Sequence, residues 1–270
     1  MKKSIFAVSA IIFTLVCACS TNPFTGKKNF NLVSNSEIFP TAFQQYNQFL
    51  GENKVIKGTA SANMVVSVGS KIRNAAEKYL NANGYKGYLD GYQWDYNLVE
   101  SNDVNAWCMP GGKIVAYTGI LPITKDEAGL ATVLGHEVAH ALANHGAQRM
   151  SRETVAQLGA VGLAAATSTK SAQAQQIWQQ AYGVTTQVGA ILPFSRSQES
   201  EADDIGLTLM AIAGYNPDRA LDFWKRMAAA GGQTPPEFLS THPSNSTRIS
   251  NIQQHIATAK AEAAKFGVKY

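Results

Sequence analysis

Apolar positions recur at helical spacing in the first third of the chain, after a polar start. Ordered structure is expected from about Ser36 onward, with one helix over residues 37–50 and a second over residues 60–80. In the second segment apolar side chains stand three and four positions apart, which places them on one face of a helix. These positions are Met64, Val65, Val68, Ile72 and Ala76.

The pattern changes to a strand-like one from residue 92. Residues 92–99, 104–109 and 113–118 are expected to be strands, and Pro110-Gly111-Gly112 predicts a turn that closes a hairpin between the last two. After Thr124 the pattern is helical, with Gly and Pro only at plausible breaks. We therefore expect an α+β fold that is mostly helical, with a small β-sheet and hairpin ahead of the helical body.

The N-terminus has the features of an export signal. Two lysines precede an apolar run over residues 5–16, which is too short to span a bilayer. A small residue then stands directly before Cys19, which resembles the processing box of bacterial lipoproteins. Cys17 fits less well because a bulkier residue precedes it. Cys19 is thus expected to become a lipidated N-terminus.

This interpretation divides the chain into a signal peptide (1–18), a flexible lipid-anchored tether (19–35) and one domain (36–270). The membrane is therefore an expected partner, through the lipid anchor. In the sorting rules of some bacteria, Asp directly after the lipidated Cys retains a lipoprotein in the inner membrane. Ser20 stands at this position, which favours the periplasmic face of the outer membrane. The alternative is an ordinary cleaved signal that yields a soluble secreted protein.

Charge and cysteine content narrow the possible partners. The formal net charge is +4, and without the two N-terminal lysines 21 basic residues stand against 19 acidic ones. No basic cluster with interleaved aromatic residues and no phosphate-binding glycine loop is present, so we expect no nucleic-acid partner. Once the signal is removed, Cys108 would be the one free thiol, which excludes an intrachain disulfide. A lone cysteine in a strand is usually a small buried apolar residue.

A helix is expected to begin near Thr124. Thr124 and Glu127 have the spacing of a capping box, in which the two side chains satisfy orphan backbone donors. A core-facing stripe continues the helix, and Gly146 is a reasonable end. The stripe comprises Leu130, Val133, Leu134, Val138, Ala141 and Leu142.

The same helix carries His136-Glu137-Val138-Ala139-His140. At about 100° per residue, His136, Glu137 and His140 fall near 0°, 100° and 40°, so they converge on one side. Two imidazoles one turn apart with a carboxylate beside them suit zinc hydrolysis. A pair of surface histidines is the alternative. The apolar and small neighbours argue against it, because polar groups among them are costly without a partner.

Zinc needs a third protein ligand. His145 would lie about 180° around the helix from His136, so we expect it to point away, as a surface or second-layer residue. Further on, Glu199 and Asp203 share a helix face, whereas Glu201 lies nearly opposite. Glu199 is the natural third ligand, and Asp203 is expected to form a hydrogen bond with a ligand histidine. Glu201 is expected to be solvated or paired with a basic side chain. Acids that simply favour a helix N-terminus are the alternative.

Three separated motifs together resemble the M48 metallopeptidases, a family that includes CAAX-processing, mitochondrial and bacterial envelope proteases. They are His136-Glu-x-x-His140, Glu199-Ser-Glu-Ala-Asp203-x-x-Gly206 and His242-Pro243-Ser244-x-x-x-Arg248-Ile249. The resemblance covers roughly residues 36–265, and three motifs in the right order are far more specific than one. The tandem helical-repeat region of some envelope members is absent, which puts any docking role of that region in doubt.

The resemblance implies a zincin-type fold and one zinc ion per chain. It assigns His136, His140 and Glu199 as metal ligands, Glu137 as the catalytic base and Asp203 as the group that orients a ligand. His242 is expected at the active site, either to stabilise the transition state or to occupy the open metal position in a latent form. Arg248 would support that loop, and Asn105-Ala106 resembles the substrate-lining edge strand.

The expected function is that of a zinc-dependent endopeptidase acting on misfolded or unassembled polypeptides of the bacterial cell envelope. The alternative is a chaperone or assembly factor that uses the same cleft with latent proteolysis. A further segment, residues 189–194, could be a lid over the cleft or equally a packed loop. The substrate, the cleavage specificity and the oligomeric state do not follow from the sequence.

Overall fold

The structure is a computed structural model that describes residues 19–173, 176, 192–230, 236, 238–239, 242 and 246–270. Side chains are described from residue 196 in the helix that begins at residue 192, and from residue 247 in the last helix. The candidate lid, residues 189–194, lies outside the described residues except for the backbone of its last three positions.

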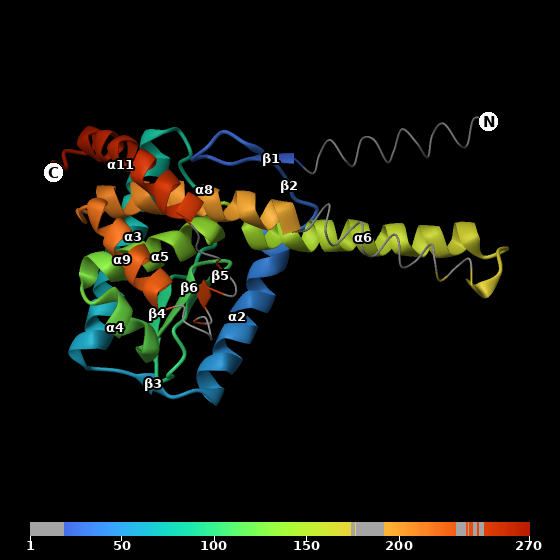
Figure 1. The fold of residues 1–270 in the computed structure, drawn as a ribbon, viewed down its shortest axis with the longest axis horizontal. Coiled ribbons are helices and arrows are strands. Elements are labelled where there is room, and N and C mark those ends of the chain that lie inside the picture. Colours follow the sequence, from blue (N-terminus) through green and yellow to red (C-terminus); the bar gives the residue numbers. More distant parts are fainter. Residues whose placement is uncertain are drawn as a thin grey trace.

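The described part of the chain is mostly helical, with small sheets, as expected (Figure 1). The strands are β1 (Cys19–Thr21), β2 (Lys28–Phe30), β3 (Val55–Ile56), β4 (Asp95–Val99), β5 (Ala106–Met109) and β6 (Lys113–Tyr117). The helices are α2 (Asn35–Glu52), α3 (Ala60–Ala82), the 3-10 turn η1 (Thr118–Ile120), α4 (Leu121–Thr124), α5 (Glu127–Leu142), α6 (His145–Thr167), α8 (Leu192–Ile212), α9 (Asp218–Ala229) and α11 (Ser246–Lys265).

The main sheet has four strands in the order β3-β4-β6-β5. β5 and β6 form the antiparallel hairpin expected from the turn signal, with Ala106 opposite Ala116, while β4 and β6 run parallel. Gly111 and Gly112 close the hairpin at φ 85° and 87°, where a side chain would also strike neighbouring rings. β5 is consequently an edge strand, and it packs beside α5.

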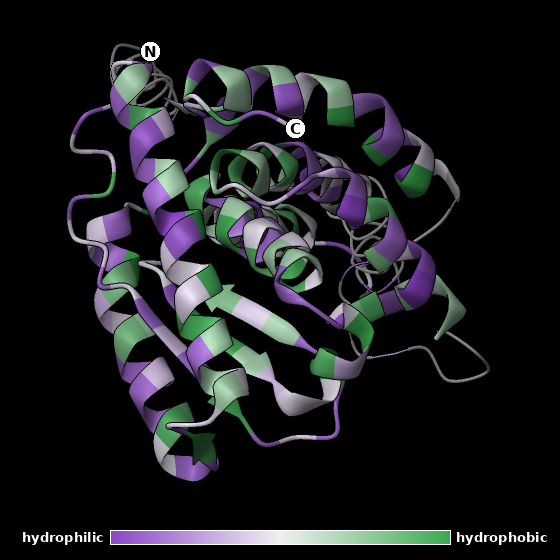
Figure 2. Ribbon diagram, turned by 90° about the vertical axis from the view of Figure 1, so that its left-hand side faces the viewer, coloured by the Kyte–Doolittle hydropathy of each residue, from purple (hydrophilic) through white to green (hydrophobic). Residues whose placement is uncertain are grey.

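Helix α5 runs through the centre of the fold. Every residue from Gly129 to Ala139 is buried, and the helix packs on α3, α8, α9 and the sheet. In Figure 2 the strands lie beneath much of the helical body, and hydrophilic and hydrophobic residues alternate along the peripheral helices. The polar residues of α5 therefore lie inside the fold, where each needs a partner.

Close packing of two glycines sets α8 against α5. A Cβ at Gly206 would lie 2.9 Å from the His136 amide nitrogen, and a Cβ at Gly135 would lie 2.9 Å from the Gly206 carbonyl oxygen. Larger side chains at either position would push the helices apart. This contact brings the acidic first half of α8 beside the two histidines of α5.

The start of α5 differs from the predicted capping box. Asp126, not Thr124, is the N-cap, and its side chain accepts a hydrogen bond from the Gly129 amide at 2.9 Å. Thr124 instead ends the short helix α4, where its hydroxyl donates to the Leu121 carbonyl. Between them Lys125 has φ 66°, so the helical path is interrupted there. The N-cap of α5 is therefore two residues later than predicted.

The end of α5 also differs from the prediction. The helix ends at Leu142, four residues before Gly146, because Asn144 adopts a left-handed conformation with φ 55°. Helix α6 begins at once with His145. The two helices are thus separated by a sharp bend, which lies within the segment that the sequence indicated as helical up to Gly146.

Helix α6 extends away from the body of the protein (Figure 1). Several of its apolar side chains, including Val155, Leu158 and Val161, are exposed. Among the described residues, none of the helices combines the length and the apolar character that crossing a membrane requires.

Residues 19–30 form a packed hairpin, whereas we expected a flexible tether. β1 and β2 pair antiparallel, and the turn between them is closed by the Asn22 amide, which donates to the Lys27 carbonyl at 2.8 Å. The Phe24 ring stacks on Tyr79 of α3, with centroids 4.8 Å apart. Asn22 is 2% exposed. A polar composition suggested disorder, but these specific contacts hold the segment on the domain.

Candidate metal centre

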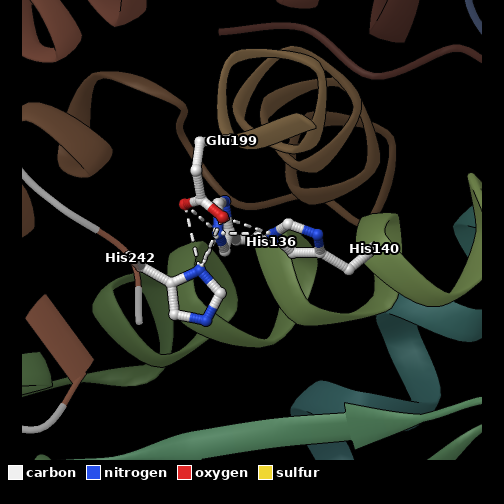
Figure 3. A group of neighbouring side chains, drawn as sticks. All are labelled: His136, His140, Glu199 and His242. Carbon is white, nitrogen blue, oxygen red and sulfur yellow. Dashed lines mark hydrogen bonds and ion pairs between the residues drawn. The ribbon is translucent and has the colours of Figure 1, made fainter. Parts of the chain in front are cut away.

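Helix α5 places His136, Glu137 and His140 together, as the helical geometry predicted. The Nε2 atoms of the two imidazoles lie 3.1 Å apart, and their rings meet edge to face (Figure 3). His136 and Glu137 are 2% and 3% exposed. Because solvent hardly reaches these groups, their charges and protons are controlled by neighbouring side chains.

Helix α8 contributes the acidic residues. Glu199 points into the space between the two imidazoles, with its oxygens 3.4 Å from His136 Nε2 and 3.2 Å from His140 Nε2. Asp203, one turn further along, contacts the other nitrogen of His136, with Oδ1 2.9 Å from Nδ1. The structure thus brings together the residues that the sequence singled out on two distant helices.

His242 completes the group from a separate segment (Figure 3). Its Nδ1 lies 3.2 Å from His136 Nε2, and its Nε2 lies 3.4 Å from Glu137 Oε1. The His242 amide donates to the Phe238 carbonyl at 2.8 Å. His242 therefore stands directly over the two helices, in contact with the carboxylates of both.

Arg248 lies behind the group and contacts both acidic residues of α8. One guanidinium nitrogen donates to Asp203 Oδ1 at 2.7 Å, and another to Glu199 Oε2 at 3.2 Å. The guanidinium carbon stacks 3.6 Å from the centroid of the Trp224 ring. Arg248 also donates to the His242 carbonyl, as expected for a residue that supports that segment.

Burial and hydrogen bonding divide the protons among these groups. Burial opposes a charge on His136, but Asp203 and Glu199 outweigh it and raise the pKa of His136 to about 9. For His140 burial prevails and lowers the pKa to about 3. Burial also opposes ionisation of Glu199, yet hydrogen bonds from the histidines hold its pKa well below the usual range. Burial raises the pKa of the Glu137 carboxyl.

The donor set fits a metal ion. His136, His140, Glu199 and His242 each offer one ligand atom, and these atoms lie within 4.8 Å of one another. Imidazole nitrogens with a carboxylate are the donors that zinc takes in catalytic sites. Glu137 Oε1 is buried and accepts no hydrogen bond from the described residues. A buried carboxylate oxygen without a hydrogen-bond donor beside such a cluster is suited to accept a proton from a water molecule or a substrate.

His145 differs from the prediction, and of the two alternatives given for Glu201 the structure has the pairing with a base. His145 does not point away: its Nδ1 lies 2.8 Å from His140 Nδ1, and it is 4% exposed. The helical wheel failed because the chain bends at Asn144, which turns the His145 ring back toward the site. Glu201 is buried, not solvated, and its Oε2 pairs with His145 Nε2 at 3.3 Å. The expected pairing with a base is therefore found.

The edge strand begins beside the centre. Ala106 is buried and pairs with β6, and the Asn105 side chain accepts from the Ala106 amide. The carbonyl of Val104, two residues before β5, accepts a hydrogen bond from the Phe238 amide. Burial raises the pKa of the Cys108 thiol well above its usual value, as expected for an inert apolar residue. A cavity of about 60 Å³ lies between Cys108 and His140.

Two aromatic residues of the site were not identified from the sequence. Trp224 of α9 lies edge-on to His136 with centroids 6.1 Å apart, and Phe238 lies 4.7 Å from the His242 ring. Both side chains are almost fully buried. Their apolar spacing indicates a core position, and no local signal in the sequence connects them with the histidines.

Comparison with known proteins places these observations in a family. The sequence pattern of peptidase family M48 matches residues 70–256. The chain is 40% identical over 176 residues to the mitochondrial metalloendopeptidase OMA1 of Schizosaccharomyces pombe, covering 64% of this chain and 50% of that protein. It is 28% identical over 200 residues to the metalloprotease YcaL of Escherichia coli, covering 74% and 76%.

A third relative is the beta-barrel assembly-enhancing protease of Yersinia pestis, 31% identical over 164 residues, which make up 58% of this chain and 33% of that protein. The matched region spans about half the length of the two yeast OMA1 proteins, at 50% and 56%. The similarity therefore covers the three motifs and the metal centre, and leaves large parts of several relatives without a counterpart in the alignment.

Proposed function

The chain belongs to peptidase family M48, and on that premise we propose that it is a zinc-dependent endopeptidase that hydrolyses misfolded or unassembled polypeptides in the bacterial cell envelope. The observation that carries this proposal is the convergence of His136, His140 and Glu199 from two helices, with Glu137 beside them. A peptidase of this kind needs these donors and this base in one buried place.

One zinc ion would be held by the Nε2 atoms of His136 and His140 and by the Glu199 carboxylate. When bound, it supplies Lewis acidity, which lowers the pKa of a bound water to about 7 and polarises the scissile carbonyl. Asp203 accepts a hydrogen bond from His136 Nδ1 and so keeps the opposite nitrogen free for the metal.

Glu137 is the proposed general base. Its carboxylate takes a proton from the attacking water and returns it to the leaving amine. The buried rings of Trp224 and Phe238 pack against His136 and His242 and so limit the access of water to these groups, and burial raises the pKa of Glu137. His242 lies beside Glu137. Once the His242 ring moves out of the cluster, it can donate a hydrogen bond to the carbonyl oxygen of the scissile bond.

Substrate is proposed to bind as an extended strand along β5, beginning near Asn105 and Ala106. A free edge offers main-chain hydrogen bonds, which give affinity with loose sequence preference. The expected partners are therefore unfolded or extended polypeptides, and no nucleic acid. The cavity of about 60 Å³ beside His140 is of a size for a small side chain.

The proposed envelope location rests on the interpretation of the N-terminal sequence as a lipoprotein signal. Removal of residues 1–18 and acylation of Cys19 would anchor the protein to the periplasmic face of the outer membrane. The test is metabolic labelling with a fatty-acid analogue: label on the wild-type chain and none on Cys19→Ala supports the anchor, and equal labelling of both contradicts it.

A chaperone or assembly factor with latent proteolysis remains the second candidate. It is favoured by His242, which lies among the metal-binding side chains and so occupies the place a substrate carbonyl would need. In this alternative the same cleft would hold extended chains without cutting them.

Glu137→Gln separates the two candidates. Zinc content by elemental analysis should stay at one ion per chain, while cleavage of an unfolded protein substrate should fall by about 10² to 10⁴-fold, because the base is lost. Undiminished cleavage would discard the assigned base. If the variant still restores envelope function in cells that lack the wild type, holding is the main activity.

A further inference from the structure

A continuous series of polar contacts joins the N-terminal hairpin to the metal-binding cluster. Asn22 Nδ2 donates to Glu201 Oε1 at 2.9 Å, and the Thr25 hydroxyl donates to the same oxygen at 2.5 Å. The other oxygen of Glu201 lies 3.3 Å from His145 Nε2, and His145 Nδ1 lies 2.8 Å from His140 Nδ1. Two side chains therefore separate the hairpin from a candidate metal ligand.

The geometry allows one consistent arrangement of protons. His140 turns Nε2 toward Glu199 and the cluster, so when that nitrogen ligates a metal its proton resides on Nδ1. Nδ1 then donates to His145 Nδ1, and His145 carries its own proton on Nε2, where it donates to the Glu201 carboxylate. Each atom in the series has a defined role, and the ring of His140 is held in one orientation.

Burial makes these contacts hard to replace with water. His145 is 4% exposed, Glu201 is 5% exposed and Asn22 is 2% exposed. The bend at Asn144 is what brings His145 into line, and the Gln198 side chain donates to the His145 carbonyl at 3.2 Å. Loss of one member would leave a buried polar atom without a partner and free the next one to rotate.

The hairpin itself is fixed on both sides of the contact. The Gly26 amide donates to the Asn22 carbonyl at 2.9 Å, and the Phe24 amide donates to Asn22 Oδ1 at 2.9 Å. Lys27 adds a positive charge 3.9 Å from the Glu201 carboxylate. Three side chains of one short turn, those of Asn22, Thr25 and Lys27, are thus directed at the same carboxylate.

We propose that residues 22–27 are a strap that holds Glu201 and His145 against His140 and so sets the affinity and geometry of the metal site. Glu201 and His145 are positioning residues, since they act through His140. The proposal rests on the proposed function, because it takes His140 to be a metal ligand. The N-terminal segment is then part of the metal centre as well as the start of the domain.

The contacts could instead serve stability alone, and the two roles predict different measurements. A stabilising contact lowers the midpoint of unfolding but leaves the bound metal unchanged. A positioning contact also weakens zinc binding and changes the ligand field. The informative readouts are zinc affinity, by competition with a chelator, and the visible absorption of the Co²⁺-substituted protein.

The test uses the full chain carrying Asn22→Ala with Thr25→Val, and separately Glu201→Gln. The expected result is zinc binding weakened by about tenfold or more, as for other changes behind a metal ligand, together with an altered Co²⁺ spectrum. Thr25→Ser, made alone, keeps the hydroxyl and should retain wild-type values. Asn31→Ala is the matched control, because Asn31 directly follows the hairpin, donates a hydrogen bond to Ser20 of β1 and does not touch Glu201.

The outcomes are distinguishable. If the double variant unfolds earlier but binds zinc and Co²⁺ as the wild type does, the strap serves stability only and the proposal is overturned. If Asn31→Ala weakens zinc binding as much as the double variant, the effect is not specific and the proposal is again overturned. If the wild-type chain binds no stoichiometric metal, the proposed function itself fails.

Discussion

His242 Nδ1 lies 2.9 Å from each carboxylate oxygen of Glu199. Glu199, the acidic donor of the cluster, is thus shared with a histidine, and together with His136 and His140 these two residues make a set of four donors. A tetrahedral ion held by all four would have no position for water or substrate, and catalytic zinc sites keep one open. If His242 serves as the fourth ligand, the site is therefore closed.

Replacing His242 by Ala should open this site. We expect zinc affinity to fall, because one donor is lost, and the turnover of an unfolded protein at saturating zinc to rise if the main effect of His242 is to close the site. Peptide release measured with matched zinc occupancy checks this. If turnover instead falls by about 10²-fold or more with zinc retained, His242 stabilises the transition state.

Zinc binding should release a proton at neutral pH. The pKa of His136 is raised to about 9, so its ring is protonated at pH 7 and must lose that proton to ligate, whereas His140, with a pKa lowered to about 3, is already neutral. We expect about one more proton released at pH 7 than at pH 10. Calorimetry in buffers of different ionisation enthalpy measures this.

Asp203→Asn provides the matched comparison for that measurement. It removes the carboxylate that accepts from His136 Nδ1 and so should lower the pKa of His136 and reduce the proton release at pH 7. Release that does not depend on pH in the wild type would contradict the assigned protonation of His136.

Gly206→Ala should loosen the metal centre through the helix packing. The new Cβ would lie 2.9 Å from the His136 amide nitrogen, so α8 must move away from α5, at a cost of about 1–3 kcal/mol in the free energy of unfolding. Glu199 moves with α8, so zinc binding should weaken too. Urea unfolding and chelator competition measure the two effects.

Gly162→Ala is the control for this change. It lies in α6 with nothing within 4 Å of the added Cβ, and alanine favours a helix by about 0.5–1 kcal/mol over glycine. This variant should keep zinc affinity and unfold no more easily than the wild type. Equal behaviour of the two alanine variants would show that the close helix contact is unimportant.

Asp126→Ala should destabilise the protein in a pH-dependent way. Burial alone would raise the pKa of Asp126, but the Gly129 amide and Arg219 outweigh it, so its pKa is lowered in the folded state. The charge then stabilises the fold above the unfolded pKa, about 4, and that contribution is lost as pH falls through the lower folded value. At pH 7 we expect a cost of about 1 kcal/mol.

Urea unfolding at pH 7 and at pH 3 checks the expectation for Asp126. The difference between the variant and the wild type should shrink at the lower pH. Asp222→Ala is the control, because Asp222 also contacts Arg219 but caps no helix. A difference that grows toward low pH would contradict the role of the ionised cap.

The sequence predicted the site where local geometry decides it. His136, Glu137 and His140 lie on one helix, so their mutual placement follows from helical pitch alone, and the hairpin of β5 and β6 follows from its glycine turn. Glu199 was predicted as a partner of these residues, and its approach depends on the contact of Gly135 with Gly206. That contact is tertiary and has no local pattern.

The errors at the two ends of α5 have one cause, which is a non-glycine residue with positive φ. Lys125 and Asn144 adopt positive φ although neither is glycine. Helix α5 therefore starts and ends at positions that the usual helix start and stop signals of the sequence do not mark. The second bend redirects His145 toward His140. The parallel pairing of β4 with β6 and the packed hairpin at residues 19–30 likewise depend on contacts between distant segments.

The position of the packed hairpin bears on where the protein would work. Cys19 opens β1 and stands three residues before Asn22, a distance of about 10 Å for extended chain. If Cys19 is acylated, no slack remains between the lipid and the peptidase domain. The enzyme would then lie against the bilayer surface in one orientation. Its substrates would be polypeptides that emerge at this surface or that fail to insert into it.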